Sequence, residues 1–215
     1  MKKKIFCYGI IVLLSLSAAM CGKKSNELDY GTVKNSVYTN NYFGLEVKFP
    51  EKWYLQSQAE QKKLMEEGGK FMAGDDKNIK AAIKASEQKT VNLFAVFNYA
   101  PGSPVPFNAN MAAIAEKVDH IPGIKKGSDY LFHTKRAFAA TQLKIDITKD
   151  GYSKKLGNVD FDSMATAMNL RGITVKQEYY VTIQKGYALL FIISYSNDNQ
   201  RKGLHEIVNS VNFKK

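Results

Sequence analysis

A long apolar stretch near the carboxyl end of the sequence constrains the fold more than any other feature. Residues 187–195 (YALLFIISY) are almost entirely apolar and rich in aromatic and β-branched side chains, which favours a buried strand. Residues 174–184 precede them and also have high β-propensity. Only Lys185 and Gly186 separate the two segments, which is the spacing of a tight hairpin. The sequence therefore predicts a sheet that contains this antiparallel hairpin.

Apolar periodicity divides the rest of the chain into short elements. Residues 45–49 alternate apolar and charged side chains and predict a half-buried strand, which Pro50 ends. Further strands are expected at residues 90–99, 130–137, 141–149 and 159–167, with a turn at Asp150 and Gly151. Helices are expected after the capping residues Ser57, Asp75 or Asp76, and 196–199, and over Met111, Ile114, Ala115 and Val118. We therefore expect one α+β domain over residues 37–215 with a largely antiparallel sheet.

The composition is that of a folded domain. The chain has 215 residues, of which 45% are hydrophobic and 12% aromatic, and this excludes a disordered or low-complexity protein. Its two cysteines, Cys7 and Cys21, both lie in the first tenth of the sequence. A disulfide framework or a multi-cysteine zinc site in the folded part is therefore excluded.

The first twenty residues have the organisation of a secretory signal peptide. Lys2, Lys3 and Lys4 form a basic start, and residues 5–20 carry no charge and include the small residues Ser17, Ala18 and Ala19. This apolar run is shorter than the roughly 20 residues that a membrane-spanning helix needs. No other segment of the sequence is long and apolar enough to span a bilayer. We therefore expect residues 1–20 to be removed during export.

Cys21 is the best-supported functional residue of the sequence. Residues 16–22 (LSAAMCG) resemble a bacterial lipobox, in which the cysteine is lipidated and becomes the mature amino terminus, although Met20 replaces the usual small residue. The lipobox interpretation predicts a protein anchored on the outer face of a bacterial membrane, with residues 21–36 as lipidated terminus and polar tether. The alternative is cleavage after Ala19, which would release a secreted protein.

Three further stretches carry a resemblance to a known family. They are residues 38–53 with the motif Tyr42-Phe43-Gly44 and then Pro50 and Trp53, residues 177–193 with Gly186 and Tyr187, and residues 207–213 with Ser210 and Phe213. Their order resembles small bacterial lipoproteins of the PsbP-like type, related in fold to the extrinsic PsbP protein of photosystem II and to a Ran-binding nuclear transport factor. The resemblance spans residues 37–213. It implies an α/β/α sandwich with a central, mainly antiparallel sheet, and a role in binding or assembly.

The resemblance carries over no catalytic residue and no cofactor, because its motifs are strand ends and turns. His120, His133 and His205 lack the spacing of metal ligands, and Asn209 stands where a second histidine would have to follow His205 on a zinc-binding helix. We therefore expect no metal site and no enzymatic activity, with His205 exposed on the last helix.

Aromatic residues near the start of the expected domain are a candidate contact surface. These residues are Tyr42, Phe43 and Trp53. Large aromatic side chains contribute strongly both to interfaces and to cores, so packing in the core is the alternative interpretation.

The charge of the chain limits its partners. The formal net charge is +11, and the basic residues are 28 lysines and 3 arginines. Nucleic-acid binding is not expected, because planar recognition of phosphates and bases favours arginine. A lysine-rich solvated surface explains the charge, and attraction to anionic lipid is the alternative.

The sequence as a whole predicts an exported, lipid-anchored, non-catalytic binding or assembly factor of the bacterial cell envelope. Its expected partners are the membrane, through the anchor, and an envelope protein or anionic lipid. One alternative is an envelope hydrolase with dispersed residues, which would need a histidine hydrogen-bonded to both a nucleophile and a carboxylate. The other alternative is a purely structural surface lipoprotein.

Overall fold

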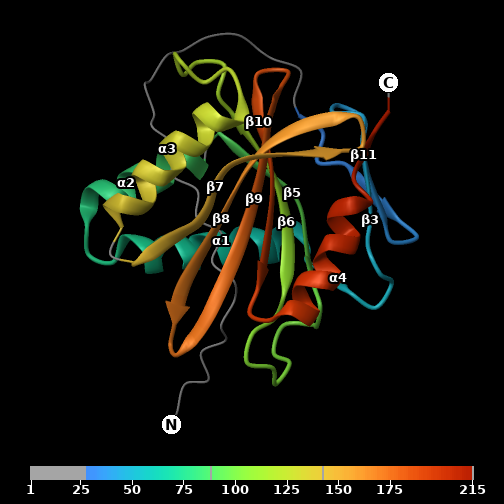
Figure 1. The fold of residues 1–215 in the computed structure, drawn as a ribbon, viewed down its shortest axis with the longest axis horizontal. Helices are drawn as coiled ribbons and strands as arrows, with labels where there is room; N and C mark the ends of the chain where they lie inside the picture. Colours follow the sequence, from blue (N-terminus) through green and yellow to red (C-terminus); the bar gives the residue numbers. More distant parts are fainter. Residues whose placement is uncertain (1–27, 88, 142, 215) are drawn as a thin grey trace.

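An antiparallel sheet of seven strands forms the centre of the fold (Figure 1). The computed structural model describes residues 28–87, 89–141 and 143–214. The strand order is β4-β5-β6-β10-β9-β8-β7, and all neighbouring pairs are antiparallel. The bounds are Tyr54–Leu55 for β4, Thr90–Phe97 for β5, Asn110–Lys117 for β6, Ile145–Leu156 for β7, Val159–Leu170 for β8, Ile173–Gln184 for β9 and Tyr187–Tyr195 for β10.

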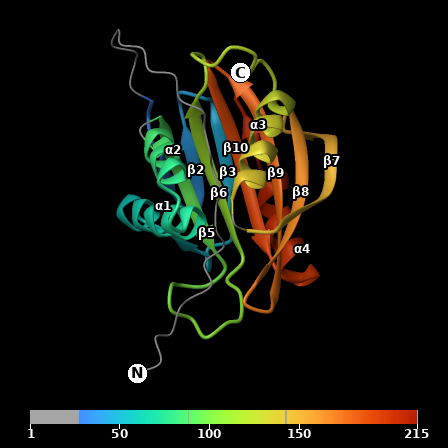
Figure 2. The same ribbon diagram turned by 90° about the vertical axis from the view of Figure 1, so that its left-hand side faces the viewer.

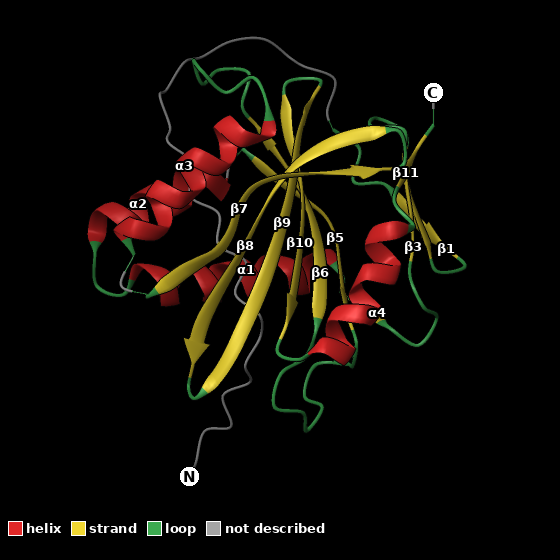
Figure 3. Cartoon of the chain, viewed as in Figure 1, coloured by secondary structure: helices red, strands yellow, loops and turns green. Residues whose placement is uncertain are grey.

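A smaller sheet of four short strands packs against one face of the large sheet (Figure 3). Its order is β1-β2-β3-β11. The bounds are Thr32–Lys34 for β1, Val37–Asn40 for β2, Leu45–Lys48 for β3 and Asn212–Phe213 for β11. Val47 of β3 and Phe213 of β11 are buried in the same cluster as Phe191 of β10, so this sheet closes one side of the core.

Helices lie on both faces of the large sheet (Figures 1 and 2). Ile192 of β10 is buried together with Met72 and Leu131, which belong to helices on one face, whereas Phe191 is buried with Leu204 on the other face. The bounds are Gln58–Ala73 for α1, Lys77–Glu87 for α2, Gly127–Ala140 for α3 and Asp198–Asn209 for α4. Helices α1, α2 and α3 share the first face, and α4 and the smaller sheet cover the second. The expected α+β class with a mainly antiparallel sheet is confirmed.

The hairpin and the helix starts lie where the sequence predicts them. Strands β9 and β10 pair throughout their length across the turn at Lys185 and Gly186. Ser57 begins α1 with a capping box, in which its Oγ accepts a hydrogen bond from the backbone N–H of Glu60 at 3.3 Å. The Oδ1 of Asp76 accepts from the first turn of α2, and Asn197 caps α4.

The helix expected over Met111, Ile114, Ala115 and Val118 is wrong, because this segment forms strand β6. The segment lies between β5 and β10, so both of its faces are buried. Apolar side chains are therefore favoured on both faces, and the continuous run from Met111 to Ala115 also contains the helical spacing. The alanines at 112, 113 and 115 suit a strand that packs between two layers.

The strand expected at residues 130–137 is wrong, because this segment belongs to helix α3. The buried positions include Tyr130, Leu131, Thr134 and Phe138, which share one helix face. At the start of the helix, Asp129 accepts hydrogen bonds from the backbone N–H groups of residues 125 and 126. The aromatic and β-branched residues that favour a strand locally therefore belong to an amphipathic helix.

The turn expected at Asp150 and Gly151 is wrong, because both residues lie within strand β7. The strand passes through both residues and pairs with β8 on either side of them. Its register shifts twice, between Ile147 and Lys149 and between Lys149 and Tyr152, and Gly151 adopts a positive φ of 63°. The two residues therefore form a bulged part of an edge strand.

The described part of the chain begins inside the segment expected to be a tether. Leu28 is buried and β1 pairs with β2, while the three residues of β1 are exposed. The expected signal peptide and Cys21 lie outside the described residues. Within residues 28–214, leaving aside 88 and 142, no helix has the length and hydrophobicity to cross a membrane.

Candidate functional site

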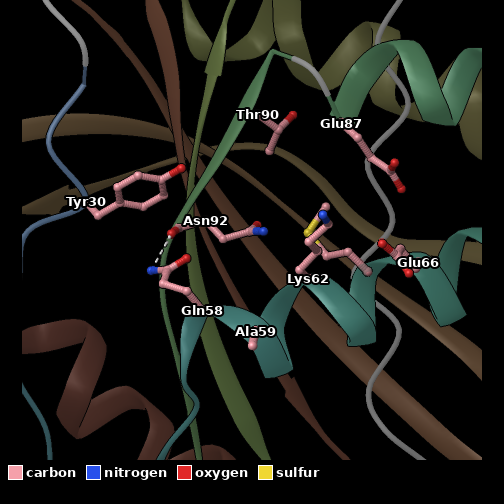
Figure 4. Close-up of a pocket in the computed structure, with 9 residues that line it drawn as sticks. Tyr30, Gln58, Ala59, Lys62, Glu66, Glu87, Thr90 and Asn92 are labelled. Atoms are coloured by element: carbon pink, nitrogen blue, oxygen red, sulfur yellow. Dashed lines mark hydrogen bonds between the residues drawn. The ribbon is translucent and has the colours of Figure 1, made fainter.

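A pocket of about 480 Å³ lies between α1 and β5 (Figure 4). Its volume is within the range of about 300–1,000 Å³ that is typical of small-molecule sites. It draws its lining from four separate parts of the chain. These are Tyr30 before β1, Gln58, Ala59, Lys62, Met65 and Glu66 of α1, Glu87 of α2, and Thr90 and Asn92 of β5.

Hydrogen bonds to β5 hold the start of α1 in place beside the pocket. The side chain of Gln58 donates from Nε2 to the carbonyl of Asn92 at 3.2 Å, which is the dashed line in Figure 4. The backbone N–H of Gln56 donates to the carbonyl of Ala95 at 2.9 Å. Because these contacts join the capped end of a helix to a sheet strand, this wall of the pocket is preorganised.

The polar groups of the pocket suit a neutral ligand with several hydrogen-bonding groups. Figure 4 shows Tyr30, Gln58 and Asn92 toward one end, with Lys62, Glu66 and Glu87 toward the other. Side-chain amides offer both donors and acceptors. One ammonium group stands with two carboxylates, so the pocket has no excess positive charge to attract an anion.

The aromatic residues predicted as a contact surface divide between two places. Tyr42 and Phe43 pack edge to face at 5.0 Å, and both also pack on Tyr187. Phe43 is 5% exposed, and Tyr42 is partly buried beneath Lys185. Trp53 is partly buried in the core cluster and contacts α4 near Gly203. Core packing accounts for most of their surface, and the contact surface stays a prediction.

A buried carboxylate, Glu178 of β9, is the centre of a polar cluster beneath α4. The side chain is 4% exposed and accepts hydrogen bonds from Tyr180 at 2.5 Å and Tyr195 at 2.9 Å. Two side chains of α4 complete the set, Arg201 through Nε at 2.7 Å and His205 through Nε2 at 3.1 Å. Glu178 therefore joins the helix to the sheet through an ion pair and several hydrogen bonds.

The cluster keeps Glu178 ionised. Burial alone would raise the pKa of the carboxyl, but the hydrogen bonds from His205, Tyr180, Arg201 and Tyr195 outweigh burial and hold the pKa well below its usual range. Burial and the charge of Glu178 raise the pKa of Tyr195, so its hydroxyl remains a donor.

His205 is not the exposed residue that the sequence predicts. Its second ring nitrogen, Nδ1, lies 3.4 Å from Nζ of Lys154 on β7, and its side chain is 24% exposed. In a hydrolase triad, the nitrogen facing away from the carboxylate contacts a serine or cysteine. Here an ammonium group takes that place, so the arrangement differs from a nucleophile–histidine pair.

The three histidines lie in three different environments. His120, after β6, contacts Nζ of Lys89 at 2.7 Å, and His133 on α3 packs against Phe132. Among the described residues, no group of three His, Cys, Asp or Glu side chains is placed to hold a metal ion.

Solved structures include similar folds at low sequence identity. PsbP (CyanoP) of Synechocystis sp. PCC 6803 aligns over 91% of this chain and 98% of its own, with 12% identity and a TM-score of 0.49. LpqN of Mycobacterium tuberculosis, a protein involved in cell envelope biogenesis, aligns over 80% and 83%, with 12% identity and a TM-score of 0.45. A protein of Bacteroides thetaiotaomicron aligns over 80% of this chain, with 11% identity and a TM-score of 0.43, and the chain spans about 45% of that protein's length.

PsbP is thus among the similar folds, in agreement with the sequence motifs. No family profile and no curated protein sequence matches the chain. At these identities and TM-scores, the similarities concern the arrangement of helices and strands, and they assign no activity to this chain.

Proposed function

We propose that this chain is an exported, lipid-anchored binding protein of the bacterial cell envelope, which holds a neutral polar ligand in the pocket between α1 and β5 and does not transform it. The observation that carries the proposal is the preformed pocket, with its amide, hydroxyl and aromatic lining. The leader sequence and the lipobox-like residues 16–22 support the cellular location.

The position of Tyr30 supports a link between pocket and membrane. Tyr30 lines the pocket and is nine residues from Cys21 in the sequence. A fully extended chain spans at most about 3.6 Å per residue, so a lipid on Cys21 would hold Tyr30 within about 32 Å of the bilayer. A ligand that is part of the envelope, or is released from it, would reach the pocket over this short distance.

The lipid anchor is tested by the intact mass of the chain extracted from its own membrane. We expect a mature protein that begins at Cys21 and carries the added mass of acyl chains. The Cys21→Ser variant should lose both the acyl mass and the membrane fraction. A wild-type protein with an unmodified Cys21 would overturn this part of the proposal and favour the secreted form.

The pocket is tested by native mass spectrometry of the gently extracted protein, with two alanine-to-phenylalanine variants. Ala59 lines the pocket on α1, so Ala59→Phe fills it, while Ala81→Phe places the same side chain on an exposed position of α2. We expect a bound small molecule on the wild type and on Ala81→Phe, and none on Ala59→Phe. A wild-type protein without ligand would favour the purely structural role, and an adduct that survives in Ala59→Phe would place the ligand elsewhere.

A further inference from the structure

We propose that Lys154, Arg201 and His205 bind the phosphate group of a ligand, at a site built on Glu178 and separate from the pocket between α1 and β5. The first argument is charge. A lysine, an arginine and an imidazole stand around one carboxylate, so the cluster has a surplus of positive charge and of hydrogen-bond donors. A phosphate group would supply the missing negative charge and acceptors.

Lys154 lacks a partner of opposite charge. Its ammonium group lies 3.4 Å from Nδ1 of His205 and 5.4 Å from the centre of the Tyr180 ring, and among the described residues no carboxylate is within ion-pair distance of it. The side chain is partly buried. Burial lowers the pKa of Lys154, and nearby Arg201 lowers it further against the opposing effect of Glu178. A titratable group shifted both by burial and by a specific charged neighbour is a candidate for a functional site.

Arg201 is held in place yet remains accessible. Its ion pair with Glu178 uses Nε, and its guanidinium carbon lies 6.0 Å from the centre of the Tyr195 ring. The side chain is 48% exposed. Glu178 occupies Nε and the Tyr195 hydroxyl also bonds the guanidinium, so an oxyanion would meet the exposed part of its planar fork.

The strands beside the cluster supply a second, independent observation. Ser163 of β8 pairs with Tyr152 on one side and Tyr180 on the other, so the three side chains form one row on this face of the sheet. Ser163 is fully buried, and its hydroxyl has no hydrogen-bond partner among the described residues. The next row places Lys149 and Ala165 beside Glu178, and Nζ of Lys149 lies 4.2 Å from the centre of the Tyr152 ring.

These rows favour a phosphate over a carboxylate ligand. A further lysine, Lys149, stands in the row of Glu178, two rows from Lys154, and Ala165 places only a small side chain between Lys149 and Glu178. A tetrahedral dianion can accept hydrogen bonds from several directions at once and offsets more than one cation, whereas a carboxylate is planar and carries one charge.

The test is calorimetric titration of the full-length chain in dodecyl maltoside with inorganic phosphate and with glycerol 3-phosphate. Lys154→Met removes the cation without leaving a buried acid unpaired. Lys155→Met is the matched control, because Lys155 is the next residue of β7 and is 64% exposed. We expect binding to the wild type and to Lys155→Met, and affinity at least about tenfold weaker for Lys154→Met, which is about 1.4 kcal/mol.

A second arm separates a free phosphate from a lipid headgroup. The same proteins are titrated with mixed micelles that contain either phosphatidylglycerol or phosphatidylcholine. Binding to phosphatidylglycerol that depends on Lys154 would identify a lipid headgroup as the source of the phosphate. Binding only to glycerol 3-phosphate would identify a soluble ligand. Urea unfolding of each variant checks that a loss of binding does not come from a loss of folding, and we expect Lys154→Met to remain folded.

Two results would overturn the proposal. One is an absence of phosphate binding by a folded wild-type protein in both arms, which would leave the cluster with only the role of holding α4 on the sheet. The other is equal affinity in Lys154→Met. Neither result bears on the pocket, because Ala59→Phe and Lys154→Met alter separate sites.

Discussion

Glu178→Gln removes the charge from the centre of the polar cluster and leaves the side-chain size unchanged. Glu178 accepts hydrogen bonds from four side chains, two of them on α4. Glutamine keeps one acceptor oxygen and replaces the other by an amino group, which would face donors. The variant therefore tests whether this carboxylate is what holds α4 to β9.

The expected loss is about 3 kcal/mol in the free energy of unfolding at pH 7. Hydrogen bonds to a charged group contribute about 1.5–3 kcal/mol, and removing one partner of a buried ion pair costs about 3–5 kcal/mol. The lower part of the range applies, because Arg201 is half exposed and regains water when the carboxylate is lost.

Urea unfolding followed by tryptophan fluorescence measures this loss. Trp53 is the single tryptophan of the chain and packs near Gly203, so its emission reports the detachment of α4. The control is Glu206→Gln, an exposed carboxylate on the same helix, which we expect to change the free energy by less than about 0.5 kcal/mol. If Glu178→Gln is as stable as this control, Glu178 does not hold the helix.

The same variant predicts the pH dependence of stability. The pKa of Glu178 is lowered from 4.5 in the folded state, so its contribution is fully present above the unfolded pKa and is lost as the pH falls below about 4.5. The wild type should therefore approach the stability of Glu178→Gln in acid. A difference between the two that stays constant from pH 7 to pH 2 would contradict the assigned ionisation.

Two further predictions use close packing elsewhere in the fold. In Gly127→Ala, the new Cβ would lie 2.1 Å from the carbonyl oxygen of Val181, so we expect the free energy of unfolding to fall by more than about 2 kcal/mol. In Gly203→Ala, the new Cβ meets only ordinary contacts, so the variant should stabilise α4 by up to about 1 kcal/mol. Urea unfolding of both variants gives the comparison. Tyr130→Phe removes a donor at 2.5 Å from the buried Glu116 and should cost about 1–3 kcal/mol by the same assay, and an unchanged midpoint would refute the role of that bond.

The elements that the sequence predicts correctly have local causes. The hairpin of β9 and β10 follows from two β-prone segments and a two-residue turn, and the starts of α1 and α4 follow from capping side chains. Each of these signals acts within a few residues, so tertiary contacts are not needed to recognise it.

Two of the three wrong secondary-structure assignments, the helix expected at β6 and the strand expected at α3, have tertiary causes. Strand β6 is alanine-rich and has low β-propensity, but its position between β5 and β10 buries both faces. Helix α3 contains aromatic and β-branched residues with good β-propensity, but its buried side chains share one helix face against β8 and β9. In both segments the contacts with neighbouring strands override local preference.

The candidate sites depend on contacts that a single sequence does not display. Lys154, Glu178 and His205 come from three different elements, so the sequence does not show that they are neighbours. Only Arg201 and His205 can be recognised as neighbours, because they are four residues apart on α4. The pocket joins Tyr30 to α1 and β5 in the same way. Recognising either site requires the topology of the sheet.

The bulged edge strand β7 has a consequence for the behaviour of the protein at high concentration. An exposed, regular edge would offer its free backbone groups to the same edge of a neighbouring molecule. In β7 the two register shifts and the positive φ of Gly151 interrupt the hydrogen-bonding row of this edge. Copies at high concentration would therefore lack a regular edge at β7 on which to join their sheets into aggregates.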